Sequence, residues 1–243
     1  MLAVLVRKLD HGAELSAADV KALESSVTAV RQIEIHEDLI EEGDRPEFVH
    51  VVLEGFAYRY KTLEDGGRQI MAWLVPGDFC DLHVAILGEM DHNIGTLSAS
   101  KIALIRPDAV VELTQTSASL SRALWWASLV DEAILREWLV GMGRRSADRQ
   151  IAHLFCELLV RLQAVGRAPG NVLKMPVTQA QLADTVGMTT VHVNRTVQQL
   201  RELGLITWRD RTLTITDVDG LQAFADFDAN YLHLNKRVRT AET

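Results

Sequence analysis

Residues 178–203, TQAQLADTVGMTTVHVNRTVQQLREL, contain the signals of two short helices joined by a tight turn. Thr178 can cap the first helix, and Gln181 follows three residues later, which is the spacing of a capping box. Gly187 supplies the left-handed conformation that ends a helix abruptly, and Thr189 can cap a second helix. The stretch therefore predicts a helix-turn-helix, whose second helix would enter the major groove of DNA.

The second predicted helix has an apolar face and a polar face. At helical spacing, the inward residues are Val193, Thr196, Val197 and Leu200, and the outward residues are Thr190, Val191, His192, Asn194 and Arg195. The Arg195 fork matches the O6 and N7 acceptors of guanine, Asn194 suits adenine or a phosphate, and Val191 suits a thymine methyl group. The outward face therefore predicts contact with base edges, and an ordinary helical hairpin without a nucleic-acid role is the alternative.

Phosphate contacts are expected at the starts of the two helices, where free backbone N–H groups attract anions. The side chains placed for these contacts are Thr178, Gln179, Thr189 and His192. Downstream, residues 204–208 and 212–216 alternate in period two around the charged turn 209–211, which predicts a β-hairpin wing. Arg209 and Arg211 at its tip would meet the DNA backbone, and a solvated turn is the alternative.

The charge of the chain is unevenly distributed. The 243 residues have a net charge of −8. Residues 1–146 contain 14 Lys and Arg against 23 Asp and Glu, whereas residues 147–243 contain 11 against 10. DNA should therefore repel the N-terminal part, and the C-terminal part should be the one that docks.

Cysteine usage and hydropathy indicate a reduced, cytoplasmic setting. Cys80 and Cys156 form neither a disulfide framework nor a CxxC metal pair. The apolar run at the N-terminus is too short for a secretion signal, and no segment reaches the roughly 18 apolar residues of a membrane span. We therefore expect a cytoplasmic protein with no membrane partner.

Short apolar runs alternate with turn residues from residue 31 to about 112. The runs 48–53, 56–60, 69–75 and 96–105 each end near glycine, proline or aspartate. Short strands at this spacing predict an antiparallel sandwich or jelly-roll, which leaves room for a small ligand. A fairly polar helical region is expected before them, with Ser16 as its start signal.

A long helix is predicted from Thr116 or Ser117 to about Met142, because no glycine or proline occurs before Gly141. Its apolar residues cover nearly all sides, namely Leu120, Leu124, Trp125, Ala127, Leu129, Ile134, Leu135, Trp138 and Leu139, with Asp131 breaking one stripe. Such a helix must be covered on several sides. One stripe can pack on its own β-domain and another on the same helix of a second subunit, which predicts a two-fold dimer through residues 116–142.

A buried connector helix in a monomer is the alternative to this dimer. That alternative would leave the surface of Trp125, Trp126 and Trp138 without a partner. We therefore favour the dimer, in which the recognition helices of the two subunits engage half-sites one helical turn apart.

The order of β-roll, long helix and winged helix-turn-helix resembles that of the Crp/Fnr family over nearly the whole chain. The matching segments are Val52-Leu53-Glu54-Gly55, Pro76-Gly77-Asp78-Phe79, residues 151–162 and the helix-turn-helix. The resemblance implies an α+β fold with a sensor β-roll domain at 1–115, a dimerisation helix at 116–145 and a DNA-binding domain at 146–243. It also implies a homodimeric transcription regulator of palindromic promoters, with RNA polymerase as a further partner and Arg195 as the base-reading arginine.

The sequence departs from the family pattern at both functional ends. Thr190 and Val191 replace the common Arg-Glu pair, so target preference should differ at the outer base pairs. Family members that bind cyclic AMP hold its phosphate with an arginine, and none occurs here between Arg68 and Arg106. An anionic phosphate buried without a cation would be poorly compensated, so cyclic AMP is not expected. An iron–sulfur cluster needs four cysteines and is excluded by the two present.

Other site candidates carry weaker signals. Asp81, His83 and His92 are the candidates for an effector pocket, whose ligand the sequence does not identify. Cys80, His83 and His92 match no standard metal or haem spacing, so no metal site is expected. Cys156 lies in an apolar stripe and is predicted to be a core residue. A redox role for Cys80 or Cys156 stays open.

The sequence suggests three classes of function. The first is the DNA-binding regulator, the second a cyclic-nucleotide-like binding module that regulates a partner protein, and the third a cupin-like metalloenzyme. A binding module has no use for a winged helix-turn-helix, and the eight histidines are too scattered for a cupin site. The sequence therefore predicts a regulator and not an enzyme.

Overall fold

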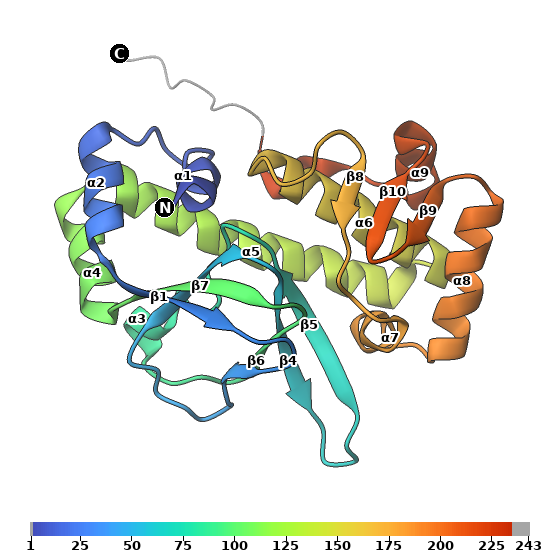
Figure 1. Cartoon of the computed structure of the whole chain (residues 1–243), viewed down its shortest axis with the longest axis horizontal. Coiled ribbons are helices and arrows are strands. Elements are labelled where there is room, and N and C mark those ends of the chain that lie inside the picture. The colour runs from blue at the N-terminus through green and yellow to red at the C-terminus, as the bar shows by residue number, and fades with distance from the viewer. Residues whose placement is uncertain (1, 235–243) are drawn as a thin grey trace.

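The computed structural model describes residues 2–234, which form a β-rich N-terminal part, one long helix and a helical C-terminal part with a small sheet (Figure 1). The predicted α+β organisation is confirmed. Residues 235–243, which the third expected domain includes, lie outside the described residues.

Two antiparallel sheets build the β-roll. One sheet has the order β1 (Val27–Ile33), β7 (Ser100–Ile105) and β3 (Val49–Glu54). The other has the order β2 (Asp38–Ile40), β6 (Asn93–Thr96), β4 (Ala57–Thr62) and β5 (Arg68–Leu74). Val52 and Ile102 from the first sheet and Ile94 from the second are fully buried in one shared core. The predicted single run 96–105 is wrong, because a bend at residues 97–99 passes the chain from one sheet to the other.

Four helices flank the β-roll. They are α1 (Ala3–Leu9), α2 (Ala17–Ser25), α3 (Val84–Leu87) and α4 (Pro107–Thr116). Ser16 begins α2 as predicted, with a capping box to Asp19. The sequence analysis missed α1, whose Leu5 and Leu9 are completely buried in a core shared with the long helix.

The long helix α5 (Ala118–Arg144) begins at Ser117, whose side chain accepts a hydrogen bond from the Leu120 backbone. The expected tryptophan surface is partly wrong. Trp126 stacks on His11, and Trp138 donates to Glu157 at 3.0 Å. Only Trp125 of the three is widely exposed, at 75%. The chain itself therefore covers more of α5 than the sequence suggested. None of the helices within residues 2–234 is long and apolar enough to cross a membrane.

The C-terminal part packs around α6 (Ala147–Ala164). Its other elements are β8 (Val172–Lys174), α7 (Gln179–Val186), α8 (Thr190–Glu202), β9 (Ile206–Arg209), β10 (Thr212–Ile215), α9 (Val218–Ala225) and the 3-10 helix η1 (Ala229–Leu232). β10 lies between β8 and β9, so the predicted hairpin gains a third strand that the sequence analysis missed. Helix α8 stands at the far edge of the molecule (Figure 1).

Candidate DNA-reading surface and effector cavity

Side-chain caps define both helices of the helix-turn-helix. The Thr178 hydroxyl accepts from the Gln181 backbone at 3.1 Å, and the Gln181 side chain accepts from the Thr178 backbone at 2.9 Å. Gly187 ends α7 with a φ of 67°, and Thr189 caps α8 by accepting from the His192 backbone at 3.3 Å. The predicted boundaries are confirmed, because they depend on local hydrogen bonds that the sequence pattern encodes.

Helix α8 buries one face and opens the other. Its buried residues are Val193, Thr196, Val197 and Leu200, as predicted. Its outward residues are Thr190, Val191, Asn194 and Arg195, all exposed, with His192 half-buried. Within residues 2–234, the Arg195 side chain has no hydrogen-bond or ion-pair partner. Val191 is 81% exposed. We call these five residues the reading face.

The flanking phosphate candidates also lie at the surface. Thr178 and Thr189 are exposed, and Gln179 is half-buried in the first turn of α7. Both threonine hydroxyls already accept cap hydrogen bonds, and the Thr178 hydroxyl also donates to Gln181 Oε1 at 3.1 Å. Thr178 therefore retains a lone pair for a ligand, whereas Thr189 retains a lone pair and its proton.

A tight two-residue turn joins the strands of the wing. Asp210 and Arg211 both have positive φ, 49° and 56°, which matches the type I′ hairpin turn. The side chains of Arg209 and Arg211 are exposed. Arg211 also lines a groove of about 540 Å³ whose opposite wall includes Glu54 and Ser98 of the β-roll. The two arginines therefore have different surroundings, which the sequence did not predict.

The first helix of the motif packs on the β-roll. Arg68 of β5 donates from Nε and Nη2 to Asp184 Oδ2 at 2.8 and 2.6 Å. The Trp73 indole donates to Thr185 Oγ1 at 2.9 Å, and the Gln69 amide donates to the Thr185 carbonyl at 3.2 Å. The residues in each contact are more than 110 positions apart in sequence, so no local sequence pattern predicts these contacts. The position of α7, and with it α8, is thus fixed against β5.

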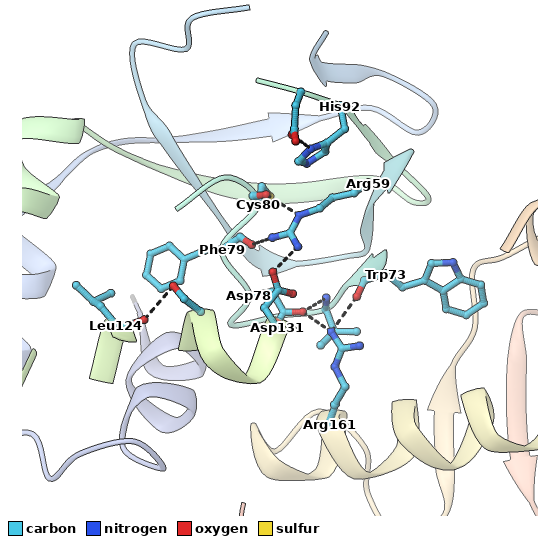
Figure 2. A network of polar contacts seen from close by, with 12 residues as sticks. Arg59, Trp73, Asp78, Phe79, Cys80, His92, Leu124, Asp131 and Arg161 are labelled. Atoms are coloured by element: carbon cyan, nitrogen blue, oxygen red, sulfur yellow. Dashed lines mark hydrogen bonds and ion pairs between the residues drawn. The ribbon is translucent and has the colours of Figure 1, made fainter. Parts of the chain in front are cut away.

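A second junction is centred on Asp78, in the turn after β5. Asp78 is almost fully buried and accepts a hydrogen bond from Arg161 Nη2 at 2.7 Å (Figure 2). It also accepts from Lys8 Nζ and from the Val75 backbone, the latter at 2.7 Å. Burial alone would raise the pKa of Asp78, but the Lys8 and Arg161 cations outweigh it and hold the pKa below its usual value. Arg161 therefore joins α6 to the β-roll.

Glu157 completes this junction from within α6. It is completely buried and accepts from Arg161 at 2.8 Å, from the Trp138 indole at 3.0 Å and from the Tyr231 hydroxyl at 3.0 Å. Burial raises the pKa of Glu157 although these partners oppose the change. Helices α5, α6 and η1 meet at this carboxylate.

A cavity of about 170 Å³ lies between the β-roll and α5, with Arg59, Asp131 and His83 among its lining residues. The Arg59 residue is only 8% exposed. It donates to the Cys80 carbonyl at 2.9 Å and the Phe79 carbonyl at 3.0 Å, and it forms an ion pair with Asp131 (Figure 2). Arg59 lies outside the interval between Arg68 and Arg106, and it reaches the cavity from β4. The signal that was available is Asp131, which interrupts the apolar stripe of α5.

The three predicted effector residues are only partly brought together. Asp81 is completely buried, accepts from the His50 backbone at 2.6 Å and pairs with His50 Nδ1 at 2.7 Å, and it does not line the cavity. His83 lines the cavity, and the His92 ring lies 5.6 Å from the His83 ring, centroid to centroid. Asp81 therefore anchors the turn after β5 rather than facing the cavity.

Both cysteines are buried. Burial raises the pKa of the Cys80 thiol well above its usual value and that of Cys156 to about 12. The thiolate is the reactive form of cysteine, so neither site favours thiol chemistry.

The capped helix-turn-helix, its wing and the β-roll define the architecture of a DNA-binding regulator. Two family models match the chain, a cyclic nucleotide-binding domain over residues 30–117 and a Crp-like helix-turn-helix domain over residues 149–224. The chain belongs to the Crp/Fnr family. It is a transcription regulator and not an enzyme.

Named relatives agree with this assignment. The transcriptional activator protein FnrL of Cereibacter sphaeroides is 27% identical over 206 residues, which cover 82% of each chain. The nitrogen fixation regulation protein FixK of Bradyrhizobium diazoefficiens is 26% identical over 189 residues, 78% of each chain. The solved structure of FixK2 from Bradyrhizobium japonicum has the same fold, with a TM-score of 0.73 at 21% identity, and the match covers 81% of this chain and 96% of that one.

Proposed function

We propose that the chain is a homodimeric transcription activator of the FixK and FnrL type that reads a two-fold symmetric promoter site. The observation that carries the proposal is the reading face, an exposed strip of base-reading side chains on a firmly capped α8. The relatives named as activators support the direction of regulation. RNA polymerase is then the further partner, and the cytoplasm is the compartment in which both partners are found.

The side chains of the reading face have different roles in DNA recognition. Arg195 reads guanine through its fork, Asn194 reads adenine or holds a phosphate, and Val191 touches a thymine methyl group. Thr190 and His192 of the reading face, and Thr178, Gln179 and Thr189 beside it, are placed for phosphate contacts. Arg209 and Arg211 of the wing add two cations. Few cations are available, so affinity depends on two copies of the motif acting together.

The dimer forms through α5. Trp125, Leu129 and Leu139 are 75, 54 and 66% exposed on that helix. Ile86 and Leu87 of α3 are 86 and 72% exposed. All of these except Leu139 line one hollow of about 520 Å³. An apolar surface of this kind on a soluble regulator is suited to a second copy of the same helix. We assign residues 1–115 to the sensor, 116–145 to dimerisation and 146–243 to DNA binding.

The sensor does not need cyclic AMP in this proposal. A cyclic phosphate in the cavity would compete with Asp131 for Arg59, whose remaining contacts are already made with two backbone carbonyls. Replacing one anion by another gains little. The Arg59–Asp131 pair ties the β-roll to α5 without a nucleotide. A module that regulates a partner protein is the second candidate, but it leaves the reading face without a role.

Selection of genomic DNA fragments by the purified protein, without added nucleotide and at physiological salt, tests the proposal. We expect enrichment of a two-fold symmetric site and a complex of two chains per site by light scattering. Leu129→Asp, which places a charge on the α5 surface, should weaken both dimer and complex, whereas Leu63→Asp on an exposed turn of the β-roll should not. Enrichment of no sequence, or binding by single chains with full affinity, would contradict the proposal.

A further inference from the structure

Two histidines and an aspartate meet beside the effector cavity. His83 precedes α3, while Asp91 and His92 precede β6. One donor atom from each of the three side chains lies within 4.8 Å of the other two. Among residues 2–234, no other group of three His, Cys, Asp or Glu side chains is arranged in this way.

One ring nitrogen of each imidazole lacks a hydrogen-bond partner. The Nε2 atoms of His83 and His92 are both buried, and neither has a hydrogen-bond partner among the described residues. Leaving a polar atom buried and unpaired typically costs about 1–3 kcal/mol, so such atoms are rare in native structures and call for an explanation. Two of them on adjacent rings point to a shared ligand.

The other ring nitrogen of His92 is already oriented. Asp91 Oδ1 lies 2.5 Å from His92 Nδ1, and the Asp91 side chain is otherwise largely exposed. A carboxylate on the distal nitrogen is the usual partner of a metal-binding histidine, because it fixes the tautomer that presents Nε2 to the metal.

We propose that His83 and His92 bind one divalent transition-metal ion of the Zn²⁺ class through Nε2, with Asp91 orienting His92 and water completing the coordination. Two imidazoles that share a tetrahedral Zn²⁺ at about 2.0 Å have ring centroids roughly 5 Å apart. The observed centroid separation is 5.6 Å, with 39° between the ring planes. The two rings are therefore about as far apart as in a coordinated pair.

The charges beside the site leave room for a cation. The Arg59 guanidinium is paired with Asp131, and the largely exposed Asp91 carboxylate adds a negative charge beside His92. The spacing of Cys80, His83 and His92 predicted no metal site, whereas the group found here contains Asp91 in place of Cys80.

The site is placed to act on the proposed dimer. His83 stands directly before α3, whose Ile86 and Leu87 form part of the hollow beside Trp125. A metal held by His83 and His92 would join this short helix to the β-roll and fix the shape of that surface. This consequence rests on the proposed dimer, whereas binding of the ion itself does not.

Titration of tag-free, chelator-treated full-length protein with ZnCl₂ against a colorimetric Zn²⁺ chelator tests the site. We expect about one Zn²⁺ per chain, with His83→Gln and His92→Gln each weakening binding by more than about tenfold and Asp91→Asn by a smaller factor. His36→Asn is the matched control, because His36 is an exposed histidine with positive φ that asparagine tolerates.

Co²⁺ provides a second measurement that does not depend on stoichiometry. A tetrahedral site with nitrogen and oxygen ligands gives visible absorption bands that should be present in the wild type and the His36→Asn variant and absent in His83→Gln. Equal Zn²⁺ affinity in the wild type and both histidine variants, with all proteins folded by circular dichroism, would overturn the proposal. No DNA is present in these assays, so their failure is separate from failure of the fragment selection.

Discussion

The reading face of α8 and the junction between α6 and the β-roll differ in how their charged groups are satisfied. On the reading face, Arg195 is exposed and has no partner within residues 2–234. At the junction, Arg161 contacts Asp78, Glu157 and the Trp73 carbonyl. A charge left unpaired at a surface is available to a ligand, whereas a charge fully paired inside the molecule fixes geometry. The comparison separates the groups that we propose contact DNA from those that hold the helix-turn-helix in position.

Removing Arg161 should break the positioning side of this comparison most severely. Arg161→Met leaves Glu157 buried with no cation and Asp78 with Lys8 alone. Breaking a buried ion pair from one side costs about 3–5 kcal/mol, and we expect a loss of that size in urea unfolding. Arg31→Met on the exposed side of β1 is the control. Adding Glu157→Gln should restore part of the loss, and a loss below about 1 kcal/mol would show that the junction does not hold the two parts together.

The interior also contains a group that is poorly satisfied. His153 Nε2 is buried and makes no well-formed hydrogen bond among the described residues, although Glu137 Oε1 lies 3.4 Å from it. Burial, with Arg145, lowers the pKa of His153 to about 4, and Glu137 opposes this change. The folded state therefore prefers the neutral ring. Its contribution is fully present above about pH 6.5 and is lost as pH falls toward 4.

We expect the His153 effect to reach at most about 2–3 kcal/mol between pH 7 and pH 4. His153→Phe keeps an aromatic ring beside Phe227 and removes the titration, so its stability should fall less steeply with acid. His36→Asn should follow the wild type. The measurement is the unfolding free energy at several pH values, and identical acid slopes in all three proteins would contradict the assignment.

Arg195→Ala tests the reading side directly. We expect a loss of about 1–3 kcal/mol in affinity for the selected site, with relaxed preference at one base pair and unchanged protein stability. Gel-shift titration against the site and against variants at each base pair measures it, with Arg31→Ala as the control for charge. An equal loss on every sequence would show instead that Arg195 holds a phosphate.

The sequence predicted those parts of the molecule whose signals are local. Thr178, Gln181, Gly187 and Thr189 each define a helix end through neighbours at most four residues away, so the helix-turn-helix was located to the residue. The alternation of apolar runs and turns predicted the β-roll for the same reason.

Contacts between distant segments were not predictable in this way. Arg59 and Asp131 are 72 residues apart, and Arg161 and Asp78 are 83 apart. A buried charge looks like any exposed charge in a sequence until the fold places its partner. Asp131 within an apolar stripe was the exception that could have been followed, since a carboxylate there needs a cation from outside its own helix.

The ion pair between Arg68 and Asp184 is less exposed than Arg195 and less buried than Arg161. Its removal should change stability less than the other substitutions do. Both side chains are about a third exposed, so solvent screens the pair. In a double-mutant cycle of Arg68→Ala and Asp184→Ala, we expect a coupling free energy of about 0.5–1 kcal/mol that decreases in high salt. A coupling above about 2 kcal/mol would mean that this pair, and not the buried Arg161 junction alone, sets where α7 and the reading face stand. A coupling free energy of zero would mean that Trp73 and Gln69 hold α7 on β5. In that case, the DNA affinity of the double variant should match that of the wild type.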